Sequence, residues 1–422
     1  MRILLSEGSG LTSRQVATRL GQLGHHVEVL SSSQFCLTRF TRHVRKVHIV
    51  PRFGDEPLAW FDAANAIAKA TAADVLFPTQ EQVTVLSARQ AELEVATIVP
   101  PFAAIQKVQD KISAFRTLQT IGAPQPRSAI MRSGEDIAKV TEYPVFIKRP
   151  ISTASSGVRR ATSARELKHA ANALGLGQRD LLVQSQCNGP LAMVQAVADQ
   201  GRLVAHHANL RVREGAGGGA ALKESIDVPG LSGILSELTM KLGWHGALSM
   251  DVILSERGPG IIDLNPRLVE PMNAWFAGID LVSLMLELAQ KQHPEARPTG
   301  RAGVRSKQLL LAILGAAEHG ATRTAIVREL RDAIARRGAY VNAAEELTPV
   351  DGDPIAVLPV VAAATLTLIR PALWRIFHSG AVGSYALTPD GWDKILALCA
   401  RRRDKVAGAI NRANSSDPEF SR

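Results

Sequence analysis

The sequence predicts a protein of mixed α/β and α+β class, and three observations lead to that prediction. Residues 2–30 run strand, glycine-containing turn, helix and strand, which is a βαβ opening. The following stretch, up to about residue 290, mixes hairpins and helices without strict alternation, as α+β folds do. Beyond residue 295 the pattern is mostly helical. We therefore expect three regions, with bounds 1–102, 103–292 and 293–422.

The composition is that of a folded globular chain. Of its 422 residues, 46% are hydrophobic and 21% are charged, and the formal net charge is +10. A basic balance suits nucleic acid, a membrane surface or acidic metabolites, but 5% aromatic residues and no recognised motif disfavour nucleic acid. The three cysteines are too widely spaced for a CxxC site, which indicates a reducing compartment. Since the N-terminus starts as a strand and not as a signal peptide, we expect a cytoplasmic protein.

The first region is expected to be a small doubly wound domain. A short apolar strand at 2–5 precedes a loop rich in Gly and Ser, and a helical apolar stripe follows it. Another helix over 60–70 precedes a strand at 74–77. Thr79–Glu81 come directly after that strand, where open α/β sheets place their ligands.

The second region should mix hairpins, further strands and several helices. Its loop 152–157 is built of small residues flanked by bases, and a turn at 199–201 joins two strands in a hairpin. The helices expected here are 103–122, 164–174, 234–242 and 281–290, and the strands are 145–148, 181–184, 193–198 and 203–207.

The most informative segment is GALSMDVILSERGPGIIDLNPR, residues 246–267. A hairpin turning through 256–258 places Asp251 opposite Asp263, and strand alternation puts Asn265 on the same face. The side chains on the other face are apolar, so that face is expected to pack against a hydrophobic core. These side chains are Met250, Val252, Leu254, Ile262 and Leu264. Facing carboxylates repel each other, and a hard cation with oxygen ligands such as Mg²⁺ offsets that repulsion. The alternative is a solvent-facing strand whose carboxylates are simply hydrated.

Arg267 continues the same side beyond Asn265. A guanidinium beside a metal–phosphate site can bind a transferring phosphoryl group or an acyl phosphate through two hydrogen bonds. The alternative is an ion pair with Glu270 or Asp263.

The run DLNPR, with an acidic residue twelve positions upstream of its Asp, resembles the metal-binding signature of the ATP-grasp superfamily. The resemblance is to its carbamoyl-phosphate-synthetase, biotin-carboxylase and D-alanine-ligase-like members. It implies a preATP-grasp α/β domain, a two-lobed ATP-grasp module and a mostly helical C-terminal region. It also implies Asp251, Asp263 and Asn265 as ligands of Mg²⁺, or of Mn²⁺ as an alternative. Most relatives carry Glu at one or both acidic positions.

The same resemblance suggests further site residues. Lys111 and Lys148 match lysines that reach the ATP phosphates, and Arg211 matches a base that contacts phosphate or substrate. Arg267 would hold the substrate carboxylate or the oxyanion. The other matches lie in the phosphate loop and the hinge strand near adenine: Ser155, Ser156, Gly157, Gln184, Ser185 and Cys187.

The activity implied by the resemblance is an ATP-dependent ligase. It would activate a small carboxylate as an acyl phosphate, release ADP and join the acyl group to an amine. The alternatives are carbamoyl-phosphate or carboxylase-type chemistry, and a basic membrane-associated protein whose nucleotide site is regulatory.

The third region contains residues 354–369, a sixteen-residue run without charge. A membrane span needs about twenty residues, so a buried helix or hairpin is favoured over a membrane-contacting one. Basic residues after it suit an anionic surface, so peripheral contact through 354–378 with the inner face of a membrane stays open. A homodimer is a further expectation, because many ATP-grasp relatives are dimers.

Overall fold

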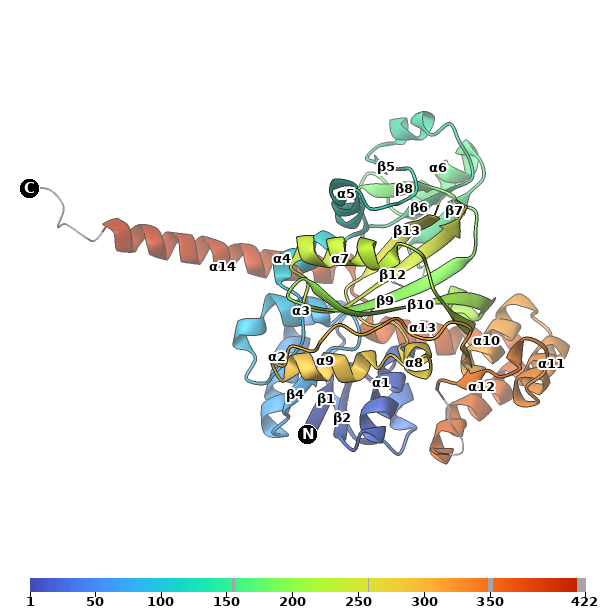
Figure 1. Ribbon diagram of the computed structural model, residues 1–422. Coiled ribbons are helices and arrows are strands. Elements are labelled where there is room, and N and C mark those ends of the chain that lie inside the picture. The colour runs from blue at the N-terminus through green and yellow to red at the C-terminus, as the bar shows by residue number, and fades with distance from the viewer. Residues whose placement is uncertain (154–155, 257, 348–351, 416–422) are drawn as a thin grey trace, which may run out of the picture.

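The computed structural model describes residues 1–153, 156–256, 258–347 and 352–415. In this part of the chain, strands form three sheets, and helices pack around them (Figure 1). The predicted mixed α/β class, with several sheets, is confirmed.

The first sheet is parallel and has the order β3-β2-β1-β4. Its apolar strands are buried on both faces, as expected where helices cover a parallel sheet. Its strands are β1 (Arg2–Leu5), β2 (His26–Ser31), β3 (Val44–Ile49) and β4 (Val75–Phe77), and the helices of this region are α1 (Leu11–Gln22), α2 (Pro57–Ala70) and α3 (Val83–Ala88).

The second sheet is antiparallel, with the order β5-β8-β6-β7. Helix α6 packs against one face of it around Leu167 and Ala171. The elements are β5 (Ser128–Met131), β6 (Val145–Lys148), β7 (Val158–Ala161), α6 (Ala164–Ala173) and β8 (Leu181–Ser185).

The third sheet has seven strands in the order β13-β12-β9-β10-β11-β14-β15. The face that carries Val194, Leu248 and Met250 packs on helix α7 in the largest core cluster. The opposite face is apolar at Val197 and Ala247, which join another core cluster, and polar at Gln195, Ser249 and Asp251, where the candidate site lies. The elements are β9 (Leu191–Asp199), β10 (Arg202–Glu214), β11 (Ala220–Ile226), α7 (Leu231–Leu242), β12 (Gly246–Ser255), β13 (Gly258–Asn265), β14 (Arg305–Lys307) and β15 (Ala344–Glu345).

The single helix expected over 103–122 is wrong, because the chain forms two helices, α4 (Phe102–Val108) and α5 (Lys111–Ile121). Asp110 caps α5 by accepting from the backbone N–H groups of Ile112 and Ser113. The backbone N–H of Lys111 donates to the Pro150 carbonyl, outside the helix. This break places Lys111 in the first turn of α5.

The third region is mostly helical. Its two strands, β14 and β15, extend the seven-stranded sheet beyond β11. The segment expected to be a buried helix or hairpin forms helix α12, which is only half-buried, with Val360 and Ala363 inside and Leu358 and Ile369 outside. In the described residues, no helix has the length and apolarity that a membrane crossing requires. The helices are α8 (Met272–Phe276), α9 (Leu281–Ala289), α10 (Leu309–His319), α11 (Arg323–Ile334), α12 (Val357–Ile369), α13 (Trp374–Tyr385) and α14 (Pro389–Ser415).

Candidate active site

The β12–β13 hairpin places Asp251 directly opposite Asp263, with Asn265 opposite Ser249. Both pairs have the predicted register. A bulge between Asp251 and Val252 then shifts the pairing by one residue toward the turn.

Because of that shift, Val252 pairs with Ile261, and Ile261 enters the core at 1% exposure. The expectation that Ile262 lies on the apolar face is therefore wrong. Its carbonyl oxygen instead accepts a hydrogen bond of 2.8 Å from the Lys148 Nζ. The bulge thus turns a backbone acceptor toward the second sheet.

Two lysines from different elements reach the aspartate pair. The Lys111 Nζ, at the start of α5, lies 2.7 and 2.8 Å from the two carboxylate oxygens of Asp263. The Lys148 Nζ, at the end of β6, is buried and also donates to the Gln184 Oε1 at 2.7 Å. Burial lowers the pKa of Lys148 to about 8, although Asp263 and Asp251 oppose that effect.

The carboxyl group of Asp251 has a raised pKa. Loss of hydration, followed by the facing carboxylate of Asp263, raises the pKa of Asp251 to about 6. Lys111, Lys148 and Arg267 act in the opposite direction. A further positive charge nearby would stabilise the ionised form of Asp251. The two facing aspartates therefore attract a cation.

The donor set fits Mg²⁺ or Mn²⁺. Two carboxylates and the amide oxygen of Asn265 stand on one hairpin, and hard cations prefer oxygen ligands. Within the described residues, no three His, Cys, Asp or Glu side chains gather as a metal-binding group, and here the third donor is an amide.

The hinge strand β8 lies beside β6, and its Gln184 is buried. The Gln184 amide bridges Lys148 and the Ser128 hydroxyl, so both of its ends are engaged. Ser185 and Cys187 follow at half-buried positions. A pocket between the second and third sheets is lined by Lys111, Phe115, Gln184, Ile262 and Asp263 among others, whereas Ser185 and Cys187 do not line it.

In the phosphate loop, Ser155 lies outside the described residues. Ser156 donates through its hydroxyl to the Thr153 carbonyl at 2.8 Å, and Gly157 is tightly packed against Ser152. A side chain at position 157 would collide with Ser152, which explains the glycine. The Thr153 hydroxyl donates to the Glu81 carboxylate at 2.5 Å and ties the loop to the first region.

Arg211 is engaged within its own strand and the turn that follows. Its guanidinium donates to the Gly218 carbonyl at 2.6 Å and pairs with Glu214 at 2.9 Å. The glycine-rich stretch around Gly215 packs closely on Leu311 of α10. The structure therefore brings Arg211 to the packing contact with the third region and shows no contact with the aspartate pair.

Sequence reasoning missed Tyr385, at the end of α13. Its side chain interacts electrostatically with Arg267 and with Glu7, Glu81 and Glu270, and burial raises the pKa of its hydroxyl. Arg267 likewise interacts with Asp251, and its Nε is buried without a hydrogen-bond partner among the described residues. Tyr385 therefore lies near Arg267 and among three glutamates that come from distant parts of the chain.

The segment after α13 is fixed to the first region. The Leu387 backbone N–H donates to the other Glu81 oxygen at 2.7 Å, so Glu81 joins the phosphate loop to the C-terminal region. Arg52 of the first region holds the last turn of α13 itself by donating to the Gly383 carbonyl at 2.8 Å. No local sequence pattern marks contacts between segments so far apart in the chain.

A buried ion-pair network is centred on Lys223 of β11. The Lys223 Nζ, which is fully buried, contacts Glu270 at 2.5 Å and Glu346 at 2.8 Å. The Gln15 amide of α1 donates to Glu346 at 2.8 Å, and the Thr12 hydroxyl accepts from the Glu270 backbone N–H at 3.1 Å. The network thus links helix α1, the central sheet and the third region.

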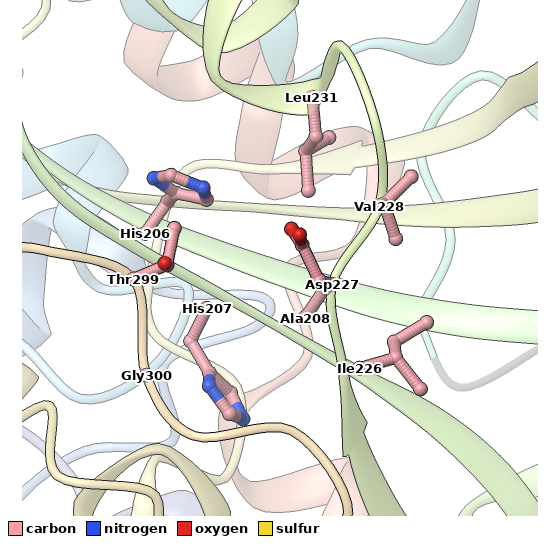
Figure 2. A pocket seen from close by; sticks show the side chains of 9 residues that line it. All are labelled: His206, His207, Ala208, Ile226, Asp227, Val228, Leu231, Thr299 and Gly300. Carbon is pink, nitrogen blue, oxygen red and sulfur yellow. The ribbon is translucent and has the colours of Figure 1, made fainter.

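Another pocket lies at the far end of β10 and is separate from the aspartate pair. Figure 2 shows that His206 and His207 point to opposite sides of that strand, so they cannot share a metal. His207 is buried and contacts the Asn273 Oδ1 at 2.7 Å.

Comparison with known proteins gives the class to which this fold corresponds. No family model matches the chain. The chain has the fold of the ATP-grasp enzymes, as solved structures with that fold superpose on it over about 70% of its length.

One of these structures is the biotin carboxylase domain of 2-oxoglutarate carboxylase from Hydrogenobacter thermophilus, a dimer in complex with MgADP, ADP and bicarbonate. It is 20% identical, the match covers 72% of this chain and 73% of that chain, and the TM-score is 0.57. Another is the L-amino acid ligase from Bacillus licheniformis, which is 17% identical over 70% of this chain and 77% of that chain, with a TM-score of 0.55.

A curated sequence relative is the D-alanine–D-alanine ligase of Pseudomonas fluorescens (strain Pf0-1). It is 32% identical over 94 residues, which are 22% of this chain and 29% of that protein. The match therefore spans less than a third of the relative's length.

Proposed function

We propose that the chain is an ATP-dependent, ADP-forming ligase. It activates a carboxylate as an acyl phosphate and joins the acyl group to an amine. The observation that carries this proposal is the facing pair Asp251 and Asp263, with Lys111 bound to one of them and Lys148 beside both. The likeness to an L-amino acid ligase and a D-alanine–D-alanine ligase supports the same reaction class.

The proposed layout has a preATP-grasp domain at 1–102, an ATP-grasp module at 103–292 and a C-terminal region at 293–422. ATP binds between the second sheet and the seven-stranded sheet. The hydrogen bond from Lys148 to the Ile262 carbonyl, which joins these two sheets, supports that location.

In this proposal Asp251, Asp263 and Asn265 hold Mg²⁺, or Mn²⁺ in its place. The metal, when bound, supplies charge neutralisation for the phosphate groups.

The chain's own residues position the reactants. Lys111 and Lys148 bind phosphate oxygens, and fixed positive charge stabilises a phosphoryl group in transfer. Arg267 orients the attacking carboxylate through its guanidinium. The phosphate loop and the hinge strand bind the rest of the nucleotide through Ser155, Ser156, Gly157, Gln184, Ser185 and Cys187, and Arg211 is assigned an indirect role in supporting the turn that follows β10.

The test is Mg²⁺-dependent ADP release in the presence of hydroxylamine, which traps acyl phosphates as hydroxamates. The panel of acids is the set of standard amino acids together with their deamino analogues. Asp263→Asn keeps the shape of the side chain and removes its charge, so it should lower the rate at least 100-fold.

The matched control is Asp136→Asn. Asp136 also pairs with a lysine, Lys139 at 2.7 Å, but on the surface and away from the cleft. The control should keep its rate within two-fold. Turnover by Asp263→Asn equal to that of the wild type would refute the proposal, provided that its melting temperature shows a folded protein.

Hydroxamate formation also separates the ligase from carboxylase-type chemistry. In that alternative, bicarbonate would stimulate ADP release more strongly than any organic acid. The biotin carboxylase likeness is the observation that favours testing bicarbonate in the same assay.

Peripheral membrane contact is a second proposal, supported by the surface of α12 and α13. Several large apolar side chains are exposed there, and Arg370 and Arg375 are exposed beside them. These apolar residues are Ile355, Leu358, Val361, Leu366, Ile369 and Ile376. Pelleting with vesicles that contain anionic lipid tests the contact, and a Leu358→Ser/Ile369→Ser variant should pellet less.

We also propose a homodimer, in line with the dimer described for the Hydrogenobacter thermophilus domain. Light scattering during size-exclusion chromatography measures the mass directly, and a mass of one chain would refute it.

A further inference from the structure

Asn209 is a buried polar side chain in β10, near the middle of the seven-stranded sheet. It has 0% exposure, and neither its Nδ2 nor its Oδ1 has a hydrogen-bond partner among the described residues. A buried amide group without a partner costs about 1–3 kcal/mol. Since Asn209 leaves both a donor and an acceptor unpaired, a partner from outside the chain is expected there.

The strand register places Asn209 on the same face as the aspartate pair. Asp251 pairs with Met193, Met193 with Asn209, and Asn209 with Ser225. Directly opposed residues in antiparallel strands project to one face. Figure 2 shows the alternation on β10 itself, with His206 and His207 on opposite sides, so Asn209 shares the side of His207. With strands spaced about 4.8 Å apart, Asn209 lies about 10 Å from Asp251 across the sheet.

The neighbours of Asn209 on this face are already satisfied by the protein. Gln195, His207 and Lys223 all bond to the segment 269–273, which follows the metal hairpin. Asn209 lies among these three and bonds to none of that segment. A purely structural role in holding the segment therefore belongs to its neighbours and not to Asn209.

The charge around this part of the site favours a cationic group. Arg267 lies toward the aspartate pair and suits a carboxylate. On the same face, Arg211 lies two residues from Asn209 and pairs with Glu214, so its charge is balanced. In the Lys223 network beside it, one lysine faces the two carboxylates of Glu270 and Glu346, which leaves an excess of negative charge.

We infer that Asn209 reads the amino group of an amino-acid substrate whose carboxylate lies between Arg267 and the aspartate pair. The Asn209 Oδ1 accepts a hydrogen bond from the substrate ammonium, and its Nδ2 donates to a substrate oxygen. A span of about 10 Å between Asp251 and Asn209 accommodates a small amino acid beside a phosphoryl group. The inference rests on the proposed ligase function and names its carboxylate substrate as an amino acid.

The experiment compares each standard L-amino acid with its deamino analogue in the hydroxylamine assay. For the best amino acid, the wild type should show a kcat/KM at least ten times that of the analogue. Asn209→Ala should bring this ratio to within three-fold of one and leave the KM for ATP within two-fold. Asn209→Asp keeps an acceptor for the ammonium, so it should retain the preference, and it serves as the second variant should Asn209→Ala fail to fold.

His206→Ala is the matched control, because it lies on the same strand but faces the other side. It should leave the ratio unchanged. An unchanged ratio in Asn209→Ala, with only a lower melting temperature, would mean that Asn209 binds a structural water and would overturn the inference. So would a wild type that uses no amino acid, or that prefers the deamino acid. Each of these results overturns the inference about Asn209. If ADP release still depends on Asp263, the proposed ligase function is unaffected, whereas ADP release that does not depend on Asp263 refutes the ligase function itself.

Discussion

Removing the charge of Lys223 should destabilise the whole chain, because this lysine is fully buried between two carboxylates. Burial alone would lower the pKa of Lys223, but Glu270 and Glu346 outweigh it and raise that pKa. Lys223→Met keeps the length of the side chain and leaves both carboxylates without their cation. Breaking a buried ion pair in this way costs about 3–5 kcal/mol.

That cost predicts a fall of about 10 °C in the melting temperature, since 1 kcal/mol corresponds to about 2–4 °C in domains of this size. The double variant Lys223→Met/Glu346→Gln removes one of the two stranded charges. It should recover about 1–3 kcal/mol relative to the sum of the single changes, which is the range of measured coupling energies for contacting groups. Urea unfolding followed by circular dichroism and thermal melting measure both quantities.

Lys241→Met is the matched control, because Lys241 pairs with Glu237 on an exposed helix surface at 2.8 Å. An exposed pair of this kind contributes about 0.3–0.5 kcal/mol, so the control should melt close to the wild type. Equal melting temperatures for Lys223→Met and Lys241→Met would contradict the network. The network would also be contradicted if the double variant lost as much free energy of unfolding as the two single variants lose in sum.

Three further changes test other parts of the site. Glu81→Gln weakens the hydrogen bonds that the Glu81 carboxylate accepts from the Thr153 hydroxyl and the Leu387 N–H. The KM for ATP in the hydroxylamine assay should therefore rise about ten-fold. A KM within two-fold of the wild type would contradict the proposal that Glu81 positions the phosphate loop. Tyr385→Ala removes a side chain that interacts with Arg267, the residue proposed to orient the acid, so it should raise the KM for the acid more than the KM for ATP, which the same assay separates. Burial lowers the pKa of His207 from 6.5 to about 4, so its contribution of about 3 kcal/mol is present above pH 6.5 and is lost as the pH falls toward 4. His207→Gln should therefore melt at temperatures that vary less between pH 7 and pH 4.5 than those of the wild type.

The β12–β13 hairpin could be predicted because all its information is local. Two strands of alternating residues joined by a short turn fix which side chains face each other, so Asp251 and Asp263 follow from the sequence alone. The bulge after Asp251 could not be predicted, since it depends on how the third sheet packs, and it moved Ile262 off the apolar face. The break before Lys111 had a local signal, the capping residue Asp110, which the apolar stripe of the surrounding helix concealed.

The substrate side of the site could not be predicted, because its residues come from distant segments. Glu81 meets Leu387 across 306 positions, and Tyr385 owes its place to that contact and not to any motif. Asn209 has a different reason: an isolated asparagine in a strand carries no sequence signal, and only its lack of a partner in the folded chain distinguishes it.

The two halves of the site differ in what assembles them. In the proposed ligase, the nucleotide would be held by one hairpin and two lysines, whereas the region around Tyr385 is assembled from α1, the central sheet and the C-terminal region through Lys223 and Glu81. Because Glu81 bonds both to Thr153 of the loop expected to hold phosphate and to the segment after Tyr385, we expect that, in the proposed ligase, a shift of that loop on nucleotide binding displaces this segment. Binding of nucleotide and binding of the acid would then be coupled through this carboxylate, and reciprocity would require that each alters the affinity of the other to the same extent.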